Sequence, residues 1–442
     1  MRHFVAFCSV VLLTACTLTP STVLPQATQA PITETVSTNA ATATPLDATE
    51  TPLSDNPTAT SVAQTVPSGG EILLLSNGDL VGVAVNDSRR RTIFGGVSAF
   101  AASPDGTMIA VIRGSGAAGE LWTVRRDGSD AQQRTDDQRS LASLHWLPDS
   151  SGFLYAASDA DSANQSSWLE WAAFCRQSVI IRRDLADPKE YPMGEGCDPV
   201  VSPDGRRIAY ATRPSRTDAS AADPGNTASN AIHLINMAGE NGWDPVSASG
   251  AEPGQDGQGL VVYNPVWTPD SKRLMVSVFV GNRVETDINL LTLVDASAGT
   301  SQLLGTSAGW NRAIQQTRDG ATYVLTTQNT GNARGSLGWD VWQTSVYNMV
   351  GVRDIYLPDG MFEAIGTLIG ESLSRAQYVA WHPDGTAVAV VMPPDWDPAI
   401  APNEDYGRVE EPGELWLWPL GGIPTTKLST PVDAASPIQW LP

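Results

Sequence analysis

A short turn motif, Ser/Thr-Pro-Asp-Gly between two runs of apolar residues, recurs along the chain and sets the strongest limit on its fold. The stretch VVSPDGRRIAYAT at residues 200–212 shows the pattern. Pro fixes φ at the first turn position, Asp accepts hydrogen bonds from nearby backbone N–H groups, and Gly accepts a positive φ, so the tetrapeptide favours a hairpin turn. The aspartates at this position are Asp105, Asp149, Asp204, Asp270, Asp319 and Asp384.

These aspartates are predicted to be structural turn residues rather than catalytic groups. A catalytic carboxylate is normally unique in its chain, whereas this one has near-equivalents at matching places. Ser150 and Ser271 replace the glycine in two units, and Arg318 replaces the proline in one. A turn tolerates such exchanges better than an active site does.

The spacing of the motif, roughly 45 to 65 residues, predicts a β-propeller. Each unit has a strand before the turn, a strand after it, a third such as ELWTV at residues 120–124, and a fourth such as SQLLGT at residues 301–306. Four strands in each unit match the blade of a propeller. The sequence therefore predicts an all-β chain folded as a single propeller of four-stranded blades.

The two ends of this region predict how the propeller closes. The region opens with EILLLS, DLVGVAV and RTIFG, which read as strands two to four of a blade, and the sequence stops at SPIQWLP, which reads as a first strand. Pairing of the C-terminal strand into the N-terminal blade would remove two free sheet edges. Seven blades are favoured, and six are the alternative because the unit from 310 to 371 is irregular.

The repeat resembles the TolB-type, WD-like β-propeller repeat over nearly all of residues 69–442. This resemblance implies the fold and says little about function. The separate N-terminal domain of TolB has no counterpart here, so the partners of TolB are not carried over. We also expect no hydrolase module of the kind that accompanies similar propellers in relatives of prolyl oligopeptidase.

The N-terminal region predicts export and a lipid anchor. Arg2, an apolar run over residues 4–13 and small residues before Cys16 form a signal peptide at residues 1–15. The sequence LTAC at residues 13–16 resembles a bacterial lipobox, which implies diacylglycerol on Cys16; the alternative is an ordinary secretory signal with an incidental cysteine. Residues 16–68, rich in Thr, Pro, Ala and Ser, predict a disordered stalk. The expected location is extracytoplasmic, anchored to the bacterial cell membrane, on the outer face of the cytoplasmic membrane or in the periplasm or outer membrane.

The net charge and the cysteines indicate which partners are disfavoured and whether a disulfide forms. The net charge of −21 disfavours a nucleic-acid partner. Outside the signal and lipobox only Cys175 and Cys197 remain, and a pair of cysteines in an exported protein predicts a disulfide. Two unpaired buried thiols are the alternative.

The sequence carries no recognisable catalytic or metal-binding pattern. There is no G-x-S-x-G elbow and no paired-histidine spacing for zinc. The histidines His145, His233 and His382 are expected to have packing or surface roles. Residues 159–165, DADSANQ, alternate oxygen-bearing side chains but lack the glycine and terminal glutamate of an EF-hand loop. We therefore predict no cofactor and no metal.

Long insertions predict where a binding surface lies. Segments 159–178, 214–230, 329–340 and 393–413 join second to third strands, and segments 249–262 and 358–376 join one unit to the next, so all six emerge on one face. Insertions confined to one face of a repeat protein commonly mark its binding surface. The candidate binding residues there are Trp168, Trp171, Trp339, Trp342, Asp395, Trp396, Asp397 and Tyr406. The alternative for each tryptophan is packing of the loop.

Four other tryptophans share the position before the turn and are predicted to pack between blades. They are Trp146, Trp267, Trp381 and Trp440. The leading functional hypothesis is a non-enzymatic extracytoplasmic lipoprotein whose propeller is a scaffold for a protein or peptide partner. One alternative is a glycan or cell-wall binding protein, and a second is a hydrolase or lyase with a site in the central channel, since fold alone does not exclude one.

Overall fold

The computed structural model describes most of the predicted propeller region, and the described residues lie within one compact unit, Ser61–Pro442. The description covers residues 69–442 except 115, 136–137, 162, 164, 166–167, 216–229, 249–260, 284–285, 309, 317–321, 329–351, 355–377, 393–411, 420–425 and 434–435.

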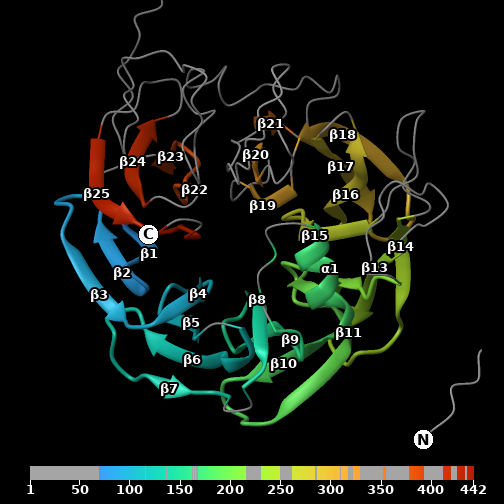
Figure 1. Ribbon diagram of the computed structural model, residues 1–442, viewed down its shortest axis with the longest axis horizontal. Helices are drawn as coiled ribbons and strands as arrows, with labels where there is room; N and C mark the ends of the chain where they lie inside the picture. The colour runs from blue at the N-terminus through green and yellow to red at the C-terminus, as the bar shows by residue number, and fades with distance from the viewer. Residues whose placement is uncertain are drawn as a thin grey trace, which may run out of the picture. The chain divides into compact units, whose positions relative to one another are not determined.

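The described chain is almost entirely antiparallel β-structure, arranged in six sheets (Figure 1). The first sheet, in the order β26-β1-β2-β3, contains β1 Glu71–Ser76, β2 Asp79–Ala84, β3 Arg90–Phe94 and β26 Gln439–Leu441. The second contains β4 Val97–Ala102, β5 Met108–Arg113, β6 Glu120–Arg125 and β7 Gln132–Gln133. A short 3-10 helix, Gly116–Ala118, lies between β5 and β6.

The third sheet has seven strands because one long strand belongs to two units. Its strands are β8 Ser140–Trp146, β9 Gly152–Ser158, β10 Ser178–Asp184, β11 Glu190–Val201, β12 Arg207–Thr212, β13 Ala231–Asn236 and β14 Trp243–Ser247. The first half of β11 pairs with β10 and the second half, from Gly196, pairs with β12. Gly196 has φ 151°, and a Cβ there would lie 2.0 Å from the carbonyl oxygen of Ala211, so the junction requires glycine.

The remaining sheets follow the same plan. The fourth contains β15 Val261–Trp267, β16 Arg273–Arg283, β17 Thr286–Asp295 and β18 Ser301–Ala308. The fifth contains β19 Trp310–Gln316, β20 Thr322–Gln328 and β21 Val352–Asp354. The sixth contains β22 Tyr378–Trp381, β23 Ala387–Met392, β24 Gly413–Pro419 and β25 Thr426–Val432. The predicted all-β class and the four-stranded antiparallel plan are confirmed.

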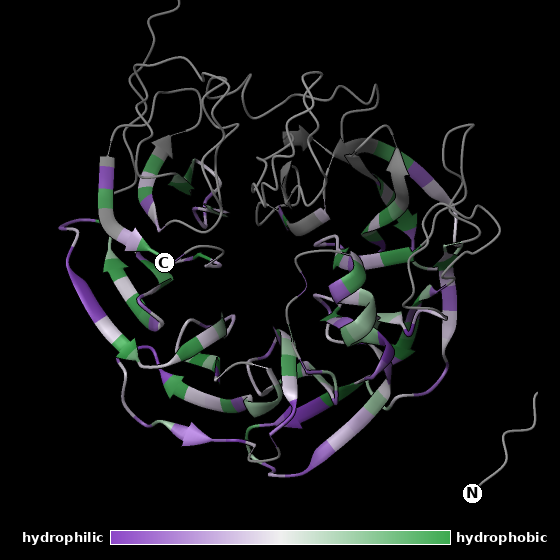
Figure 2. Ribbon diagram, in the orientation of Figure 1, coloured by the Kyte–Doolittle hydropathy of each residue, from purple (hydrophilic) through white to green (hydrophobic). Residues whose placement is uncertain are grey.

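Apolar side chains lie between neighbouring sheets and form the core. Ile72 and Val83 of the first sheet share one cluster with Val391 and Leu417 of the sixth. Burial of such side chains contributes about 25 cal/mol for each Å² removed from water. Figure 2 shows the opposite pattern at an outer strand, since β7 is hydrophilic whereas much of β2 is hydrophobic.

Two of the four tryptophans before the turn bridge neighbouring sheets by hydrogen bonds. The Nε1 of Trp146 donates to the carbonyl oxygen of Ala101 at 2.8 Å, and the Nε1 of Trp267 donates to that of Val200 at 3.4 Å. Each indole thus reaches the first strand of the preceding unit. Trp381 and Trp440 are also buried.

The described turn aspartates organise their hairpins through side-chain oxygens. In the turn of Asp204, Oδ1 accepts hydrogen bonds from the hydroxyl of Ser202 at 2.5 Å and the backbone N–H of Arg206 at 3.1 Å. The backbone N–H of Asp204 donates to the hydroxyl of Ser271 at 3.0 Å, in the turn of the next unit. Ser271 has φ 59°, so it occupies the glycine position of its turn and links two turns. Asp105 and Ser150 form the same link at 3.2 Å.

The C-terminal strand pairs with the first strand of the described region. Strand β26 is antiparallel to β1, with Ile72 opposite Trp440 and Glu71 opposite Leu441. Figure 1 shows the C-terminus beside β1. The strand pairing that the two ends of the sequence predict is therefore present.

One element differs from the expected loops. Helix α1, Trp168–Arg176, lies in the connection from β9 to β10, where the sequence predicts a long loop. Its apolar residues at positions 168, 171, 172 and 175 share one helical face, a pattern short enough to be missed between strands. Among the helices of the described residues, none is long and apolar enough to span a membrane.

Candidate functional site

The sheets have two ends, which carry different connections. We call the end with the turns of Asp105, Asp149, Asp204, Asp270 and Asp384 the short-turn face, and the opposite end the insertion face. Because successive strands are antiparallel, the connection from β9 to β10 leaves on the insertion face. Helix α1 therefore lies on the insertion face.

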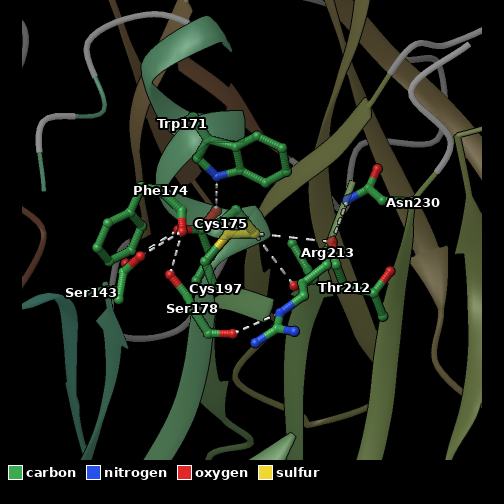
Figure 3. The surroundings of a disulfide bond; sticks show 12 residues. Ser143, Trp171, Phe174, Cys175, Ser178, Cys197, Thr212, Arg213 and Asn230 are labelled. Atoms are coloured by element: carbon green, nitrogen blue, oxygen red, sulfur yellow. Dashed lines mark hydrogen bonds between the residues drawn. A yellow bond between two sulfur atoms is a disulfide. The ribbon is translucent and has the colours of Figure 1, made fainter. Parts of the chain in front are cut away.

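A disulfide fixes helix α1 to the sheet. Cys175 in its last turn is bonded to Cys197 of β11, with the Cα atoms 5.1 Å apart and both side chains fully buried. Figure 3 shows the bond between the helix and the strands, with Trp171 and Phe174 on the helix side. A cross-link closing a loop of this length stabilises a fold by about 3 kcal/mol. The pairing predicted from the sequence is present.

The two candidate binding tryptophans of this segment form part of a buried aromatic cluster. Trp168 is 8% exposed and stacks on Phe279, with ring centroids 5.6 Å apart. Trp171 is 1% exposed and contacts Tyr263 and Trp310, which stack on each other at 3.8 Å. In this structure both indoles pack inside the protein, as the alternative to ligand binding expects. A ligand-binding role would require α1 to move.

Three neighbouring strands contain the same bulge. In β8, β11 and β15, two consecutive residues lie opposite a single residue of the next strand. The first residue of each pair has a positive φ. These residues are Ser143 with φ 58°, Asp198 with φ 53° and Asn264 with φ 51°. The left-handed conformation is unfavourable for most side chains but tolerated by Asn and Asp.

The three bulges meet around the carboxylate of Asp198. Its Oδ2 accepts hydrogen bonds from the indole Nε1 of Trp171 at 2.8 Å and from the backbone N–H of Asn264 at 3.2 Å. Its Oδ1 accepts one from the hydroxyl of Ser143 at 3.2 Å. Burial raises the pKa of Asp198, while these three hydrogen bonds act to lower it. Asp198 thus joins three first strands to α1.

The Asp198 cluster is not among the site residues predicted from the sequence, although the sequence carries a signal for it. Ser143, Asp198 and Asn264 each lie six residues before the turn aspartate of their unit, and Asp198 and Asn264 are both followed by proline. Polar residues at one place in the repeat indicate a position that is neither turn nor core.

A cavity of about 510 Å³ lies where the first strands approach the short-turn face. Its walls come from β4, β8, β11, β15, β19 and β26 and from the prolines of three turns. Half-buried His145 lies on the wall, next to the bulge of β8. Burial lowers the pKa of His145 to about 4, so its ring is uncharged at neutral pH. The lining includes His145, Trp146, Val200, Val266, Trp267 and Gln439.

A second cavity of about 490 Å³ also opens on the short-turn face, between two units. Asp149 and Asp204 line it together with Arg182. The guanidinium of Arg182 is held by Asp184 at 2.9 and 3.0 Å and by the carbonyl oxygen of Met237 at 3.1 Å. The guanidinium of Arg182 is therefore already hydrogen-bonded within the protein.

Several predicted site residues lie outside the described residues. They are Cys16, Trp339, Trp342, Asp395, Trp396, Asp397, Tyr406 and the turn residue Asp319. In the described part of residues 159–165, and elsewhere in the described chain, no group of three or more His, Cys, Asp or Glu side chains could hold a metal ion.

Comparison with known proteins supports the fold. No protein-family model and no curated protein sequence matches the chain. An oligogalacturonate lyase in complex with manganese is similar over 77% of this chain and 82% of its own, at 13% identity and a TM-score of 0.50. TolB from Acinetobacter baumannii is similar over 84% of this chain and 82% of its own, at 14% identity and a TM-score of 0.40.

The comparisons and the arrangement of the sheets together define the fold class of the protein. The all-β architecture and the match to the lyase structure identify a β-propeller fold. At 13% identity the likeness to the lyase extends to the fold alone. A shared fold does not imply a shared function, because function depends on the residues of the site.

Proposed function

We propose that the protein is a binding scaffold that holds a protein or peptide partner on its insertion face. The observation that carries this proposal is the fixed position of helix α1 on that face. The disulfide, the aromatic cluster and Asp198 all anchor the helix, and Leu169 on it is nevertheless 46% exposed. An exposed leucine on a rigid platform favours contact with a partner, because little ordering entropy is lost on binding.

The proposal includes a closed propeller of seven blades. The seven-stranded sheet counts as two blades that share β11, and β26 completes the blade of β1, β2 and β3. First strands of successive units contact one another, from β4 through β8, β11, β15, β19 and β22 to β26. This succession supports closure, which would leave no sheet edge free at either end of the chain.

We also propose that the scaffold works outside the cytoplasm, tethered through a lipid on Cys16 and a stalk of residues 16–68. The disulfide supports an oxidising compartment, since such bonds are rare in the cytosol of mesophiles. The apolar run over residues 4–13 and the LTAC sequence that ends it at Cys16 support the signal peptide and the anchor. A partner in the cell envelope would then lie within reach of the stalk.

Copurification from detergent-solubilised envelopes tests the scaffold role. The full-length protein is compared with Leu169→Asp and with Leu303→Asp as the matched control, because Leu303 is also 46% exposed but lies on β18, near the turn that joins it to β17 on the short-turn face. We expect one protein to be recovered with the wild type and the control and to be depleted at least tenfold by Leu169→Asp. Equal recovery with both variants would contradict the proposal.

A further inference from the structure

The cavity at the short-turn end of the first strands has the character of a small-molecule site. Its volume of about 510 Å³ falls in the range of ligand pockets, roughly 300 to 1,000 Å³. Most of the wall is apolar, and among the described residues that line it no side chain carries a charge, although the chain as a whole has a net charge of −21. An uncharged lining disfavours a charged ligand, which would lose hydration without gaining a partner.

The apolar wall is held in place before any ligand enters. The indoles of Trp146 and Trp267 are fixed by hydrogen bonds to the carbonyl oxygens of Ala101 and Val200. Gln439 is fixed as well, since its Oε1 accepts a hydrogen bond from the backbone N–H of Ala102 at 2.8 Å. A preorganised wall lowers the entropy cost of binding.

Two polar side chains of the wall offer complementary hydrogen bonds. The amide Nε2 of Gln439 is a donor that bonds to no described residue. Half-buried His145 lies on the wall with its imidazole uncharged at neutral pH, so its ring carries one N–H donor and one acceptor nitrogen. A few placed polar groups in an apolar pocket typically set the orientation of a ligand.

We propose that this cavity binds an uncharged, mostly apolar small molecule that carries one hydrogen-bond donor and one acceptor group. The ligand would lie on the face opposite the proposed partner surface. It would contact first strands from several units at once, so its binding would also resist separation of those units. The site is independent of Leu169 and of the proposed scaffold role.

A matched pair of fluorescent probes tests the proposal with the full-length protein. N-phenyl-1-naphthylamine is uncharged and has one N–H donor, and 8-anilinonaphthalene-1-sulfonate has the same ring system with an added negative charge. We expect saturable binding of the uncharged probe with one site per chain. The sulfonate should bind at least tenfold more weakly, also at 0.5 M salt, where the long-range repulsion is screened.

Variants then locate the binding. Val200→Phe should fill part of the cavity and lower the affinity for the uncharged probe at least tenfold. The control Val179→Phe changes a half-buried valine of β10 outside the cavity and should bind the probe as the wild type does. If Val200→Phe does not fold, the same measurement is made with Val266→Phe, which changes the matching residue of β15. Absence of saturable binding, equal binding of the sulfonate, or equal losses in the cavity and control variants would each overturn the proposal.

Discussion

The indole Nε1 of Trp171 donates a hydrogen bond of 2.8 Å to Oδ2 of Asp198, and this bond joins helix α1 to the bulge of β11. Asp198 immediately follows Cys197, whose disulfide holds the same helix. Two adjacent residues of one strand thus fix α1 by a covalent bond and a hydrogen bond. The position of α1 on the insertion face depends on this pair.

Loss of the indole donor is expected to destabilise the protein. Trp171→Phe keeps an aromatic ring but leaves Asp198 with one hydrogen bond fewer. Trp168→Phe is the control, because it makes the same change to an indole that does not hydrogen-bond to Asp198. We expect the free energy of unfolding of Trp171→Phe to be lower than that of Trp168→Phe by about 1 to 2 kcal/mol. Urea unfolding followed by circular dichroism measures the difference, and equal stability of the two variants would show that the hydrogen bond contributes nothing.

The half-buried carboxyl of Asp198 is expected to make stability depend on pH. Burial raises its pKa above the ordinary value of 3.8, so the folded protein binds this proton more tightly than the unfolded chain. The contribution of Asp198 to the free energy of unfolding is then greatest below pH 3.8 and falls as the pH rises through the raised pKa.

Asp198→Asn tests this dependence, because the amide oxygen retains an acceptor for Trp171 and for the backbone N–H of Asn264. The free energy of unfolding of the variant minus that of the wild type should increase from pH 3.8 upward, as other carboxylates cancel in the difference. A difference that is constant with pH, or that decreases, would contradict the raised pKa.

Reduction of the disulfide is expected to release helix α1. We expect dithiothreitol to lower the free energy of unfolding by about 2 to 4 kcal/mol and to speed tryptic cleavage after exposed Arg176. A variant carrying Cys175→Ser and Cys197→Ser should show fast cleavage with and without the reductant. Unchanged cleavage of the reduced wild type would mean that packing alone holds the helix.

Removal of a turn aspartate is expected to affect stability without affecting partner binding. Asp204→Ala removes the acceptor of the Ser202 hydroxyl and one of the two acceptors of the backbone N–H of Arg206, at a cost of about 1 to 2 kcal/mol. Asp204→Asn keeps an acceptor oxygen and should cost less. Thermal unfolding gives the stability, and copurification gives the partner yield, which should match the wild type in both variants. A loss of partner with retained stability would return Asp204 to the list of functional candidates.

The strands and turns were predictable because their signals are local. Pro203, Asp204 and Gly205 specify a turn from adjacent residues, and the alternating apolar residues on either side specify strands. The pairing of β26 with β1 followed from counting strands at the two ends. The positions of Trp146 and Trp267 followed from their shared place in the repeat.

Helix α1 and the Asp198 cluster were harder to predict because they depend on distant contacts. A helix of nine residues is marginal in isolation, so α1 exists through Cys197 and the aromatic cluster. The bulges at Ser143 and Asn264 lie far from Asp198 in sequence and meet it only in the folded sheet. The cavity likewise draws its wall from six strands, and no single stretch of sequence indicates its volume.

The scaffold role is tested most directly by site-specific photo-crosslinking in cells. The full-length protein carries p-benzoyl-phenylalanine in place of Leu169 on α1 or, as the control of equal exposure, in place of Leu303 on β18. The account predicts a single defined cross-linked protein from position 169 and none from position 303. The same products from both positions, or a defined product from position 303 alone, would contradict a partner surface on the insertion face.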